Sequence, residues 1–409
     1  MKGLEYWSLD TNPETGEKFQ AFLGYLRVAH NGNADIDSFI ASEYGEALAE
    51  ILQTRFLYEE DPMGENTLEY FKSLGLKKEI HEDEDYYTRW EILTPLAMYE
   101  EKGKNKKYPL VIANHGGSNA IETDEFCFGL PQIAGKEGFM VAYLQNTNWE
   151  NTDRVLGLIA ENYPLDEERV YITGYSQGGY QATSTYFRIP EKITAAAPCG
   201  NDIYRTYDNF NIPYTEEETA RLKKTFVPFM QIVGCCEASS FVPVNDWKPR
   251  KDWGIEAGAE PYINPRRDDS RDPTRIIGGR RRFSDMTVPD PGVDIQQWMI
   301  SRLNMRLDTL NCEPRKQEQC ISYLHTPEDE LHHILGFYGD KERIETYYGY
   351  KHYIADIWNR DGIHAFRYIA VENSPHWVPV MTGPLVWDFF KQFRRDKQTG
   401  KIVEEVYKY

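Results

Sequence analysis

The sequence predicts an α/β protein with a mainly parallel, doubly wound sheet, and three observations lead to this fold class. Short apolar runs alternate with helix-like segments between residues 86 and 200. Within that region, the stretch VYITGYSQGGYQA places a serine between glycines where an apolar run passes into a helix-like segment. A further apolar run returns late in the chain, at residues 365–373. Strands that alternate with helices indicate a parallel sheet covered by helices on both faces.

The composition limits the classes of partner. The 409 residues include 65 acidic and 46 basic side chains, which gives a net charge of −19. This balance argues against a general affinity for nucleic acid or for an anionic membrane. No window reaches the roughly 18 consecutive apolar residues of a membrane span, and the opening MKGLEYWSLD lacks the zones of a secretory signal. We therefore expect a cytoplasmic protein with no nucleic-acid or membrane partner.

The cysteines do not suggest a disulfide framework or a metal site. Six cysteines are scattered along the chain, and although Cys312 and Cys320 could close a small loop, free thiols are the expectation. No Cys/His spacing resembles a zinc site. The cysteines and histidines therefore do not predict a zinc site.

The distribution of turn residues and apolar runs along the chain predicts three regions. Residues 1–85 form an N-terminal appendage with at least one helix, over 35–56 behind a possible Asp cap. Residues 86–237 and 361–409 form the α/β domain, and residues 238–360 form an insertion or lid, in which 323–358 has helical spacing. Strands are expected at 86–93, 108–117, 139–145, 169–174, 193–200, 226–234 and 365–373, and helices at 153–163, 178–187 and 383–395.

The serine within VYITGYSQGGYQA has the setting of a nucleophile. A sharp turn between strand and helix makes a serine project from the scaffold, and side chains two places before and after it would collide. Gly174 and Gly178 stand at those places around Ser176, and Gly179 would ease the helix against the strand. We expect Ser176 to attack a carbonyl carbon.

An oxyanion that forms in such an attack needs backbone N–H groups aimed at it. The amide of Gln177, at the start of the helix, supplies one. The loop after the strand at 108–114 supplies the other, and we expect it from Gly117, with Gly116 or Ser118 as alternatives. His115 is expected to order this loop and, with Tyr175 and Trp377, to lie at the substrate-binding surface.

Nine histidines compete for the role of general base. In a strand–serine–helix architecture the chain order is Ser, then Asp or Glu, then His in a loop after the last strand. Only His376 satisfies that order, because His364 precedes the strand at 365–373 and His332 and His333 lie in the insertion.

The orienting carboxylate is expected after the strand at 226–234, where it could hydrogen-bond the imidazole and fix its tautomer. Glu237 lies three residues past Gly234. Asp246 is the reserve, and acids of the later insertion such as Asp361 stay open.

These residues resemble the α/β-hydrolase superfamily, and within it the esterase branch of polyhydroxybutyrate depolymerases and feruloyl or acetylxylan esterases. The likeness lies in YPLVIANHGG, YPLDEERVYITGYSQGGYQA, IPEKITAAAPCG, PFMQIVG and SPHWVP with VWDFF. It implies an α/β-hydrolase fold and hydrolysis of a small-molecule carboxylic ester through an acyl-enzyme, with Ser176, His376 and Glu237 as the triad and no cofactor. The chain departs from that branch in lacking a secretory signal, in the size of the insertion and in a Glu where Asp is usual.

Two other functions stay open, and two segments have alternative roles. The rivals are a peptidase or amidase of the prolyl oligopeptidase type and a hydrolase-like protein that binds a ligand without chemistry. Seven arginines between 266 and 282 either pair with neighbouring aspartates or receive an anionic substrate. The aromatic run at 347–358 fills a core or lines a pocket. The first 85 residues could form a second lid component or a homo-oligomer contact.

Overall fold

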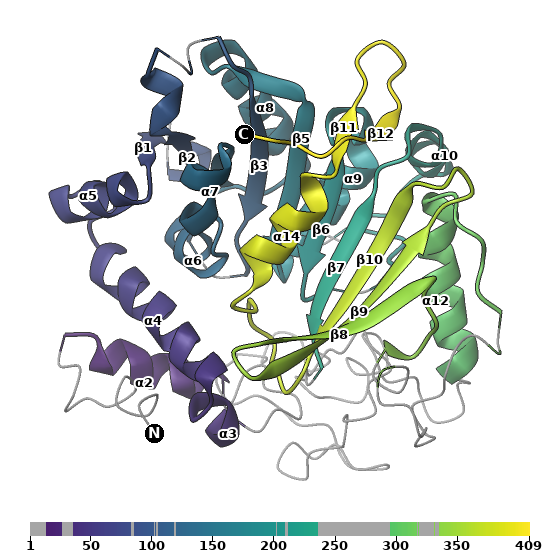
Figure 1. Cartoon of the computed structure of the whole chain (residues 1–409), viewed down its shortest axis with the longest axis horizontal. Helices are drawn as coiled ribbons and strands as arrows, with labels where there is room; N and C mark the ends of the chain where they lie inside the picture. Colours follow the sequence, from purple (N-terminus) through teal and green to yellow (C-terminus); the bar gives the residue numbers. More distant parts are fainter. Residues whose placement is uncertain are drawn as a thin grey trace.

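A single large sheet forms the centre of the protein. The computed structural model describes residues 14–26, 36–82, 86–101, 103, 105–117, 120–201, 203–208, 212–235, 295–316, 318, 331 and 335–409. Ten strands of these residues pair in the order β1-β2-β4-β3-β5-β6-β7-β10-β9-β8 (Figure 1). The strands are β1 (Leu76–His81), β2 (Trp90–Pro95), β3 (Tyr108–Asn114), β4 (Met140–Leu144), β5 (Leu165–Tyr175), β6 (Ala195–Cys199), β7 (Phe229–Gly234), β8 (Lys341–Tyr347), β9 (Tyr350–Trp358) and β10 (His364–Val371).

The middle of the sheet is parallel and its two edges are antiparallel. Strands β4, β3, β5, β6, β7 and β10 run in one direction. Strands β1 and β2 form one antiparallel edge, and β9 and β8 form the other. Every residue of β3, β4, β6, β7 and β10 is buried, as expected for strands covered on both faces. The carboxyl ends of the parallel strands therefore share one edge, where open α/β sheets bind their ligands.

Helices cover both faces of the sheet. In Figure 1, α6 (Ile121–Cys127), α7 (Pro131–Glu137) and α14 (Thr382–Phe390) lie in front of the sheet, and α8 (Trp149–Asn162) and α9 (Gln177–Arg188) lie behind it. The remaining helices are α2 (Gly16–Tyr25), α3 (Ile36–Ile40), α4 (Glu43–Tyr58), α5 (Glu65–Ser73), α10 (Glu216–Thr225) and α12 (Ile295–Thr309), with short 3₁₀ turns at η2 (Tyr86–Thr88), η3 (Leu96–Tyr99) and η4 (Pro190–Lys192).

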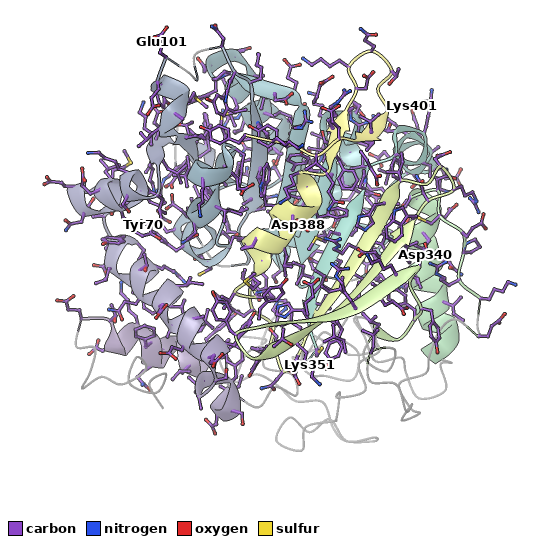
Figure 2. The ribbon with its side chains drawn as sticks, in the orientation of Figure 1. Tyr70, Glu101, Asp340, Lys351, Asp388 and Lys401 are labelled. Carbon is purple, nitrogen blue, oxygen red and sulfur yellow. The ribbon has the colours of Figure 1, made fainter. Side chains whose placement is uncertain are left out.

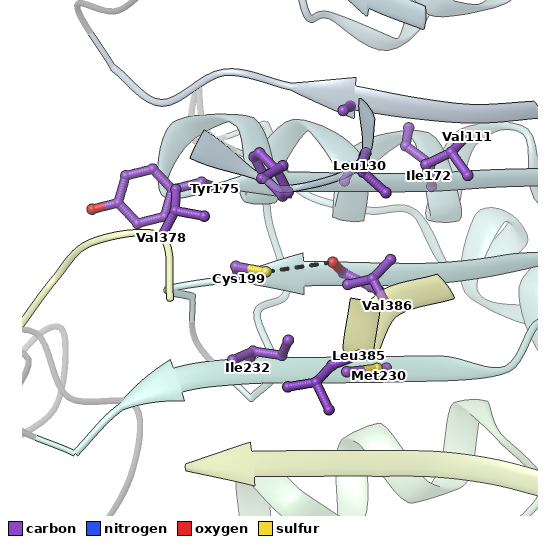
Figure 3. Close-up of a cluster of buried hydrophobic side chains, with 14 of the residues drawn as sticks. Val111, Leu130, Ile172, Tyr175, Cys199, Met230, Ile232, Val378, Leu385 and Val386 are labelled. Atoms are coloured by element: carbon purple, nitrogen blue, oxygen red, sulfur yellow. Dashed lines mark hydrogen bonds between the residues drawn. The ribbon is translucent and has the colours of Figure 1, made fainter. Parts of the chain in front are cut away.

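Helix α14 closes the front face with apolar side chains. Leu385 and Val386 lie over β6 and β7 (Figure 3). The ring of Trp387 stacks on Phe139 at a centroid distance of 3.9 Å, and Phe390 stacks on Tyr171 at 4.8 Å. Because large aromatic rings bury much apolar area, this helix fixes the chain that follows β10 against the sheet.

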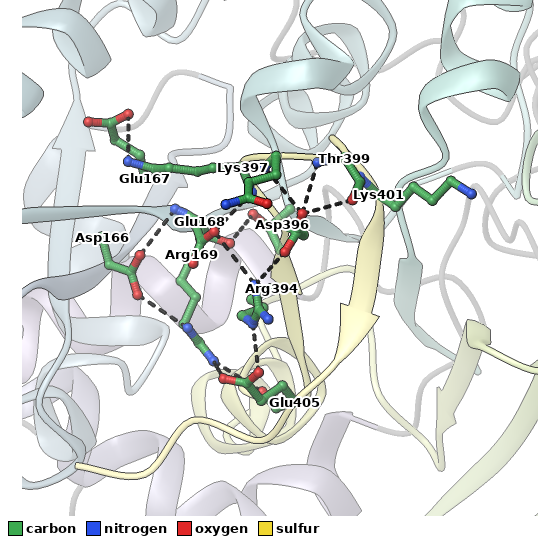
Figure 4. A network of polar contacts seen from close by, with 12 residues as sticks. Asp166, Glu167, Glu168, Arg169, Arg394, Asp396, Lys397, Thr399, Lys401 and Glu405 are labelled. Carbon is green, nitrogen blue, oxygen red and sulfur yellow. Dashed lines mark hydrogen bonds and ion pairs between the residues drawn. The ribbon is translucent and has the colours of Figure 1, made fainter.

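The expected helix over 383–395 is wrong beyond Phe390. The chain turns there into a small hairpin of β11 (Phe393–Arg395) and β12 (Ile402–Glu404). Glu405 accepts hydrogen bonds from Arg394 at 2.7 Å and from Arg169 at 3.1 Å, which ties the hairpin to the start of β5 (Figure 4). The pairing of β11 with β12 replaces the helix that the sequence pattern suggested for these residues.

The helical interpretation of 323–358 is wrong for residues 341–358, which form the hairpin of β8 and β9. Its turn places Tyr348 and Gly349 at φ values of 52° and 76°. A two-residue turn with positive φ at both positions matches the twist of a β-hairpin. Strand β9 pairs with β10, and β1, from the expected N-terminal appendage, pairs with β2. Both segments thus contribute strands to the central sheet.

The helix expected over 35–56 is divided, and its cap is a serine. Helix α3 ends at Ile40, and Ser42 caps α4 by accepting a hydrogen bond from the N–H of Gly45. Serine is a strong N-cap residue, so the Asp cap expected from the sequence is not the cap of the long helix.

Five charged side chains form a buried cluster beside β1, β2 and α6. Charged residues such as Glu101 and Lys401 extend from the periphery (Figure 2). In contrast, Lys78 contacts Glu91 at 2.9 Å and Glu125 at 2.6 Å, all three with fully buried side chains. Arg89 bridges Glu91 and Glu122. Since Glu122 and Glu125 belong to α6, this cluster anchors the helix that follows the loop after β3.

Candidate active site

Ser176 occupies a strained turn between β5 and α9. Its φ and ψ are 52° and −114°, a conformation that non-glycine residues rarely adopt. The N–H of Ser176 donates to the carbonyl of Cys199 at 2.9 Å. Its carbonyl accepts hydrogen bonds from the N–H of Tyr180 at 3.0 Å and from Nδ2 of Asn201 at 2.7 Å. Backbone bonds on both sides of the serine therefore hold the turn.

Glycines provide the space for this turn, as the sequence predicted. A Cβ on Gly174 would lie 2.4 Å from the carbonyl oxygen of Gly178, and a Cβ on Gly178 would lie 2.1 Å from the carbonyl oxygen of Asn114. At Gly179 the obstacle is different from the expected one. A Cβ there would lie 1.8 Å from Oδ1 of Asn201, so this glycine makes room for a side chain beyond the end of β6.

His376 lies beside the serine although 200 positions separate them in the chain. Its Nε2 is 2.9 Å from Oγ of Ser176. The hydroxyl of Tyr175 donates to the carbonyl oxygen of His376 at 2.7 Å, which fixes the loop after β10 to the end of β5. A side chain at Gly200 would approach the imidazole Cε1 to 3.1 Å, so the end of β6 borders the ring as well.

The structure does not describe two of the three carboxylates considered for the triad. Glu237 and Asp246 lie outside the described residues. The chain just before them runs against the histidine loop, because a Cβ on Gly234 would lie 2.3 Å from the carbonyl oxygen of Ser374. In addition, the N–H of Cys235 donates to the carbonyl of Val371 at 2.8 Å.

Asp361 and His364 lie at the opposite end of β10 from His376. Eight residues of β10 separate the two ends, a length of about 23 Å at the usual rise of a strand. Asp361 accepts a hydrogen bond from Asn311 at 2.9 Å. His364 contacts Asp356 at 2.8 Å. Neither residue is brought to the serine.

The loop after β3 lies against the start of α9. A Cβ on Gly117 would lie 3.0 Å from the side-chain oxygen of Gln177. As the first residue of α9, Gln177 has no intrahelical acceptor for its N–H. The two ring nitrogens of His115 lie 2.9 Å from the carbonyl oxygens of Gly116 and Gln145, respectively, which ties the loop to the end of β4. Ser118, an alternative donor, is outside the described residues.

An aromatic group from two distant segments surrounds the histidine loop. Trp377 is 5% exposed and Tyr175 is 2% exposed, and their ring centroids are 5.7 Å apart. On its other side Trp377 meets Phe22 edge-on at 4.7 Å and Tyr25 at 6.0 Å, both from α2. The N-terminal segment therefore supports the histidine loop, a contact that no local sequence pattern indicated.

The described part of the chain offers neither a metal cluster nor a membrane span. Among these residues, no three His, Cys, Asp or Glu side chains are grouped so that they could bind an ion. Likewise, no helix described here has both the length and the apolar character to cross a bilayer. The four described cysteines are buried.

The sheet order and the serine turn together define the α/β-hydrolase fold. Parallel strands from β4 to β10 flank β5, β2 runs antiparallel to them, and β5 enters α9 through the strained serine. This strand–serine–helix turn with a histidine after the last central strand is the arrangement typical of that fold.

Comparisons with known proteins give partial likenesses to hydrolases. No protein-family model matches the sequence. A bifunctional acetylxylan esterase/xylanase from Neocallimastix patriciarum is 25% identical over 118 residues, which cover 25% of this chain. The chain spans 17% of the length of that curated relative.

The solved structures named below match less than half of the chain. An S-formylglutathione hydrolase from Agrobacterium tumefaciens aligns with a TM-score of 0.32 and 13% identity, over 39% of this chain and 76% of that one. A mutant feruloyl esterase module from Clostridium thermocellum, complexed with sinapinate, aligns with a TM-score of 0.32 and 15% identity, over 39% and 68%. An acylaminoacyl peptidase from Pyrococcus horikoshii aligns with a TM-score of 0.29 and 14% identity, over 42% and 34%.

Proposed function

We propose that this protein is a serine hydrolase that cleaves carboxylic esters through an acyl-enzyme intermediate. Ser176 is the nucleophile, His376 is the general base and then the general acid, and Glu237 is the carboxylate that orients the imidazole. The observation that carries the proposal is the 2.9 Å contact between Nε2 of His376 and Oγ of a serine held at a positive φ. A nucleophile within hydrogen-bond reach of its base is the signature of covalent acyl transfer.

The reaction proceeds in two mirror-image steps. In the first, the Oγ proton of Ser176 moves to Nε2 of His376 while Oγ bonds to the ester carbonyl carbon. The oxyanion receives hydrogen bonds from the amides of Gln177 and Gly117. When the intermediate collapses, the C–O bond to the alcohol breaks and His376 protonates the leaving oxygen. Water then gives a proton to His376, attacks the acyl carbon and releases the acid, and the proton returns to Ser176.

The position of β7 supports a carboxylate from the segment that follows it. Gly234 and Cys235 contact the loop that carries His376. Glu237 follows Cys235 by two residues in the chain. A carboxylate there would accept the Nδ1–H bond and stabilise the imidazolium formed during the reaction.

Small acyl esters are the substrates to examine first. The curated relative that matches 118 residues has acetylxylan esterase in its name, and one structural neighbour is a feruloyl esterase module. We therefore propose acetyl or hydroxycinnamoyl esters of small soluble alcohols or sugars as the substrate class.

The test is steady-state hydrolysis of chromogenic acetyl, butyryl and feruloyl esters. The variants are Ser176→Ala, His376→Ala, Glu237→Ala and Asp246→Ala. Ser73→Ala is the matched control, because the Ser73 hydroxyl is exposed on α5 and donates to the local carbonyl of Tyr70. Removing one member of a triad abolishes most of the catalytic rate. The kcat of Ser176→Ala and of His376→Ala should therefore fall by at least about a thousandfold.

The outcome separates the proposal from its rivals. Loss of activity in Glu237→Ala but not in Asp246→Ala would support the assigned acid. Cleavage of anilide or peptide substrates in preference to esters would favour a peptidase. A folded wild type that is inert towards both classes of substrate would contradict the proposal and favour a ligand-binding protein.

A further inference from the structure

The three residues that end β6 and follow it contact both the serine and the histidine. The carbonyl of Cys199 accepts the N–H of Ser176 at 2.9 Å. Gly200, at a φ of 63°, lies so close to His376 that a Cβ there would approach Nδ1 to 3.3 Å. Asn201 donates from Nδ2 to the carbonyl oxygen of Ser176 at 2.7 Å. The segment thus borders the two groups that must stay aligned for the proposed reaction.

Asn201 is held in place from the side of β7. Its side chain is almost wholly buried, with 1% of the residue exposed. Its main-chain oxygen accepts a hydrogen bond from Nε2 of Gln231, a fully buried residue of β7. The backbone of Asn201 is therefore anchored to β7, while its buried side-chain amide bonds the carbonyl of Ser176.

We propose that Asn201 is a positioning residue, whose side-chain amide fixes the carbonyl of Ser176 and so keeps Oγ directed at His376. This inference rests on the proposed function and concerns the same site. The orientation of a carbonyl sets the ψ angle of its residue, and Ser176 has an unusual ψ of −114°. A strained conformation persists only where its surroundings over-determine it, and the Asn201 bond acts directly on that angle.

Two features of the site indicate that the donor half of the amide matters. Oδ1 of Asn201 is buried and has no hydrogen-bond partner in the described part of the chain, which is destabilising. Gly179 leaves the space that Oδ1 occupies, since a Cβ there would come within 1.8 Å of it. The fold thus accommodates an amide of which only the donor, Nδ2, has a hydrogen-bond partner among the described residues. That partner is the carbonyl oxygen of Ser176.

The test compares Asn201→Ala and Asn201→Asp with a matched control. Asn359→Ala removes another buried asparagine, whose Oδ1 accepts the N–H groups of Asp361 and Ile363 far from the serine. Small misplacements of a reacting group can cost about a hundredfold in rate. We expect kcat of Asn201→Ala to fall about tenfold to a hundredfold with KM little changed, whereas Asn359→Ala loses thermal stability but keeps kcat.

The Asn201→Asp variant adds a pH signature. A neutral carboxyl has the shape of the amide and can donate its O–H to the serine carbonyl, whereas a carboxylate only accepts and would repel that oxygen. Burial raises the pKa of a carboxyl, and position 201 is buried. Relative to wild type in the same buffers, activity of Asn201→Asp should therefore fall as pH rises through the raised pKa of this carboxyl. If Asn201 only stabilised the fold, the ratio of Asn201→Asp activity to wild-type activity would not change with pH in this way.

The inference fails if Asn201→Ala keeps the wild-type kcat, or if its loss is matched by Asn359→Ala. A crystal structure of Asn201→Ala is a second test, and it needs no ester substrate. A Ser176 ψ that stays near −114° would overturn the inference, and a relaxed ψ would support it. If wild type and Ser176→Ala are equally inert towards esters, the proposed function fails, and the crystal structure still decides the role of Asn201.

Discussion

The buried cluster around Lys78 makes the most quantitative prediction. Burial raises the pKa of Glu125 to about 8, against the opposing effect of Lys78. With Glu125 protonated at neutral pH, Lys78 and Arg89 balance Glu91 and Glu122. Lys78→Met keeps an apolar stem beside Phe71, over whose ring the ammonium lies at 5.0 Å, but leaves one buried negative charge in excess.

Two estimates give the loss in the free energy of unfolding that Lys78→Met should cause. Breaking a buried pair by removing one partner costs about 3–5 kcal/mol. The protein can instead protonate one of the remaining glutamates; with a pKa of about 4.3 for a glutamate in an unfolded chain, this costs about 3.7 kcal/mol at pH 7, or 1.36 kcal/mol for each of 2.7 pH units. We therefore expect Lys78→Met to lower the free energy of unfolding by about 3–4 kcal/mol at pH 7, and by about 2.3 kcal/mol or less at pH 6.

Urea unfolding followed by tryptophan fluorescence at both pH values measures this loss. Lys77→Met is the matched control, because Lys77 precedes Lys78 on β1 and pairs at the surface with Glu79. An exposed pair contributes about 0–1 kcal/mol. Equal stabilities of the two variants, or a loss in Lys78→Met that does not change with pH, would refute the reasoning.

Three further perturbations test particular sites. Burial raises the pKa of Glu125 well above its unfolded value of 4.5, so stability should decline as pH rises from about 4.5 to 8, and Glu125→Gln should flatten that decline in thermal-denaturation scans. Burial of Asp356 would raise its pKa, but hydrogen bonds from His364 and Arg367 outweigh it and hold that pKa well below 3.8; Asp356→Asn should therefore lower Tm at pH 7, and the gap to wild type should close as pH falls below about 4. Gly179→Ala should reduce kcat sharply because its Cβ would meet Asn201, whereas Gly157→Ala in α8, where nothing lies within 4 Å, should keep kcat; equal kcat values would contradict the close approach.

Local features of the site were predictable because short-range sterics determine them. The glycines at 174 and 178 flank a serine whose turn leaves no room for side chains at these two positions. The five consecutive residues 174–178 are enough to predict this turn. The position of His376 followed from chain order, since a loop after the last central strand has one place in a parallel sheet. The structure brings its Nε2 to 2.9 Å from the serine.

Features that depend on pairing between distant segments were not predictable. The charges of Lys78, Glu91 and Glu125 look like ordinary surface charges in the sequence, and they meet only because β1 pairs with β2 and α6 packs against them. Residues 341–358 contain aromatic and charged residues that fit a helix as well as a strand. Pairing of β9 with β10 decides between the two.

One signal in the sequence pointed to Asn201 but could not identify it. Gly179 is a second glycine after the serine, beyond the one that the turn requires. It indicated a close approach, which was expected between the helix and the strand, whereas the neighbour is Asn201. Only the placement of the loop after β6 reveals that the neighbour is an amide bonded to the serine carbonyl.

The central claim is that Ser176 forms a covalent acyl-enzyme with the help of His376. The most direct measurement is rapid-quench intact mass spectrometry of the protein with a slowly hydrolysed chromogenic ester, followed by peptide mapping. We predict a burst of alcohol equal to the enzyme concentration and an acyl adduct on the peptide that contains Ser176, with neither in Ser176→Ala and both in Ser73→Ala. Ester turnover that persists in Ser176→Ala, or an adduct on another residue, would contradict the claim.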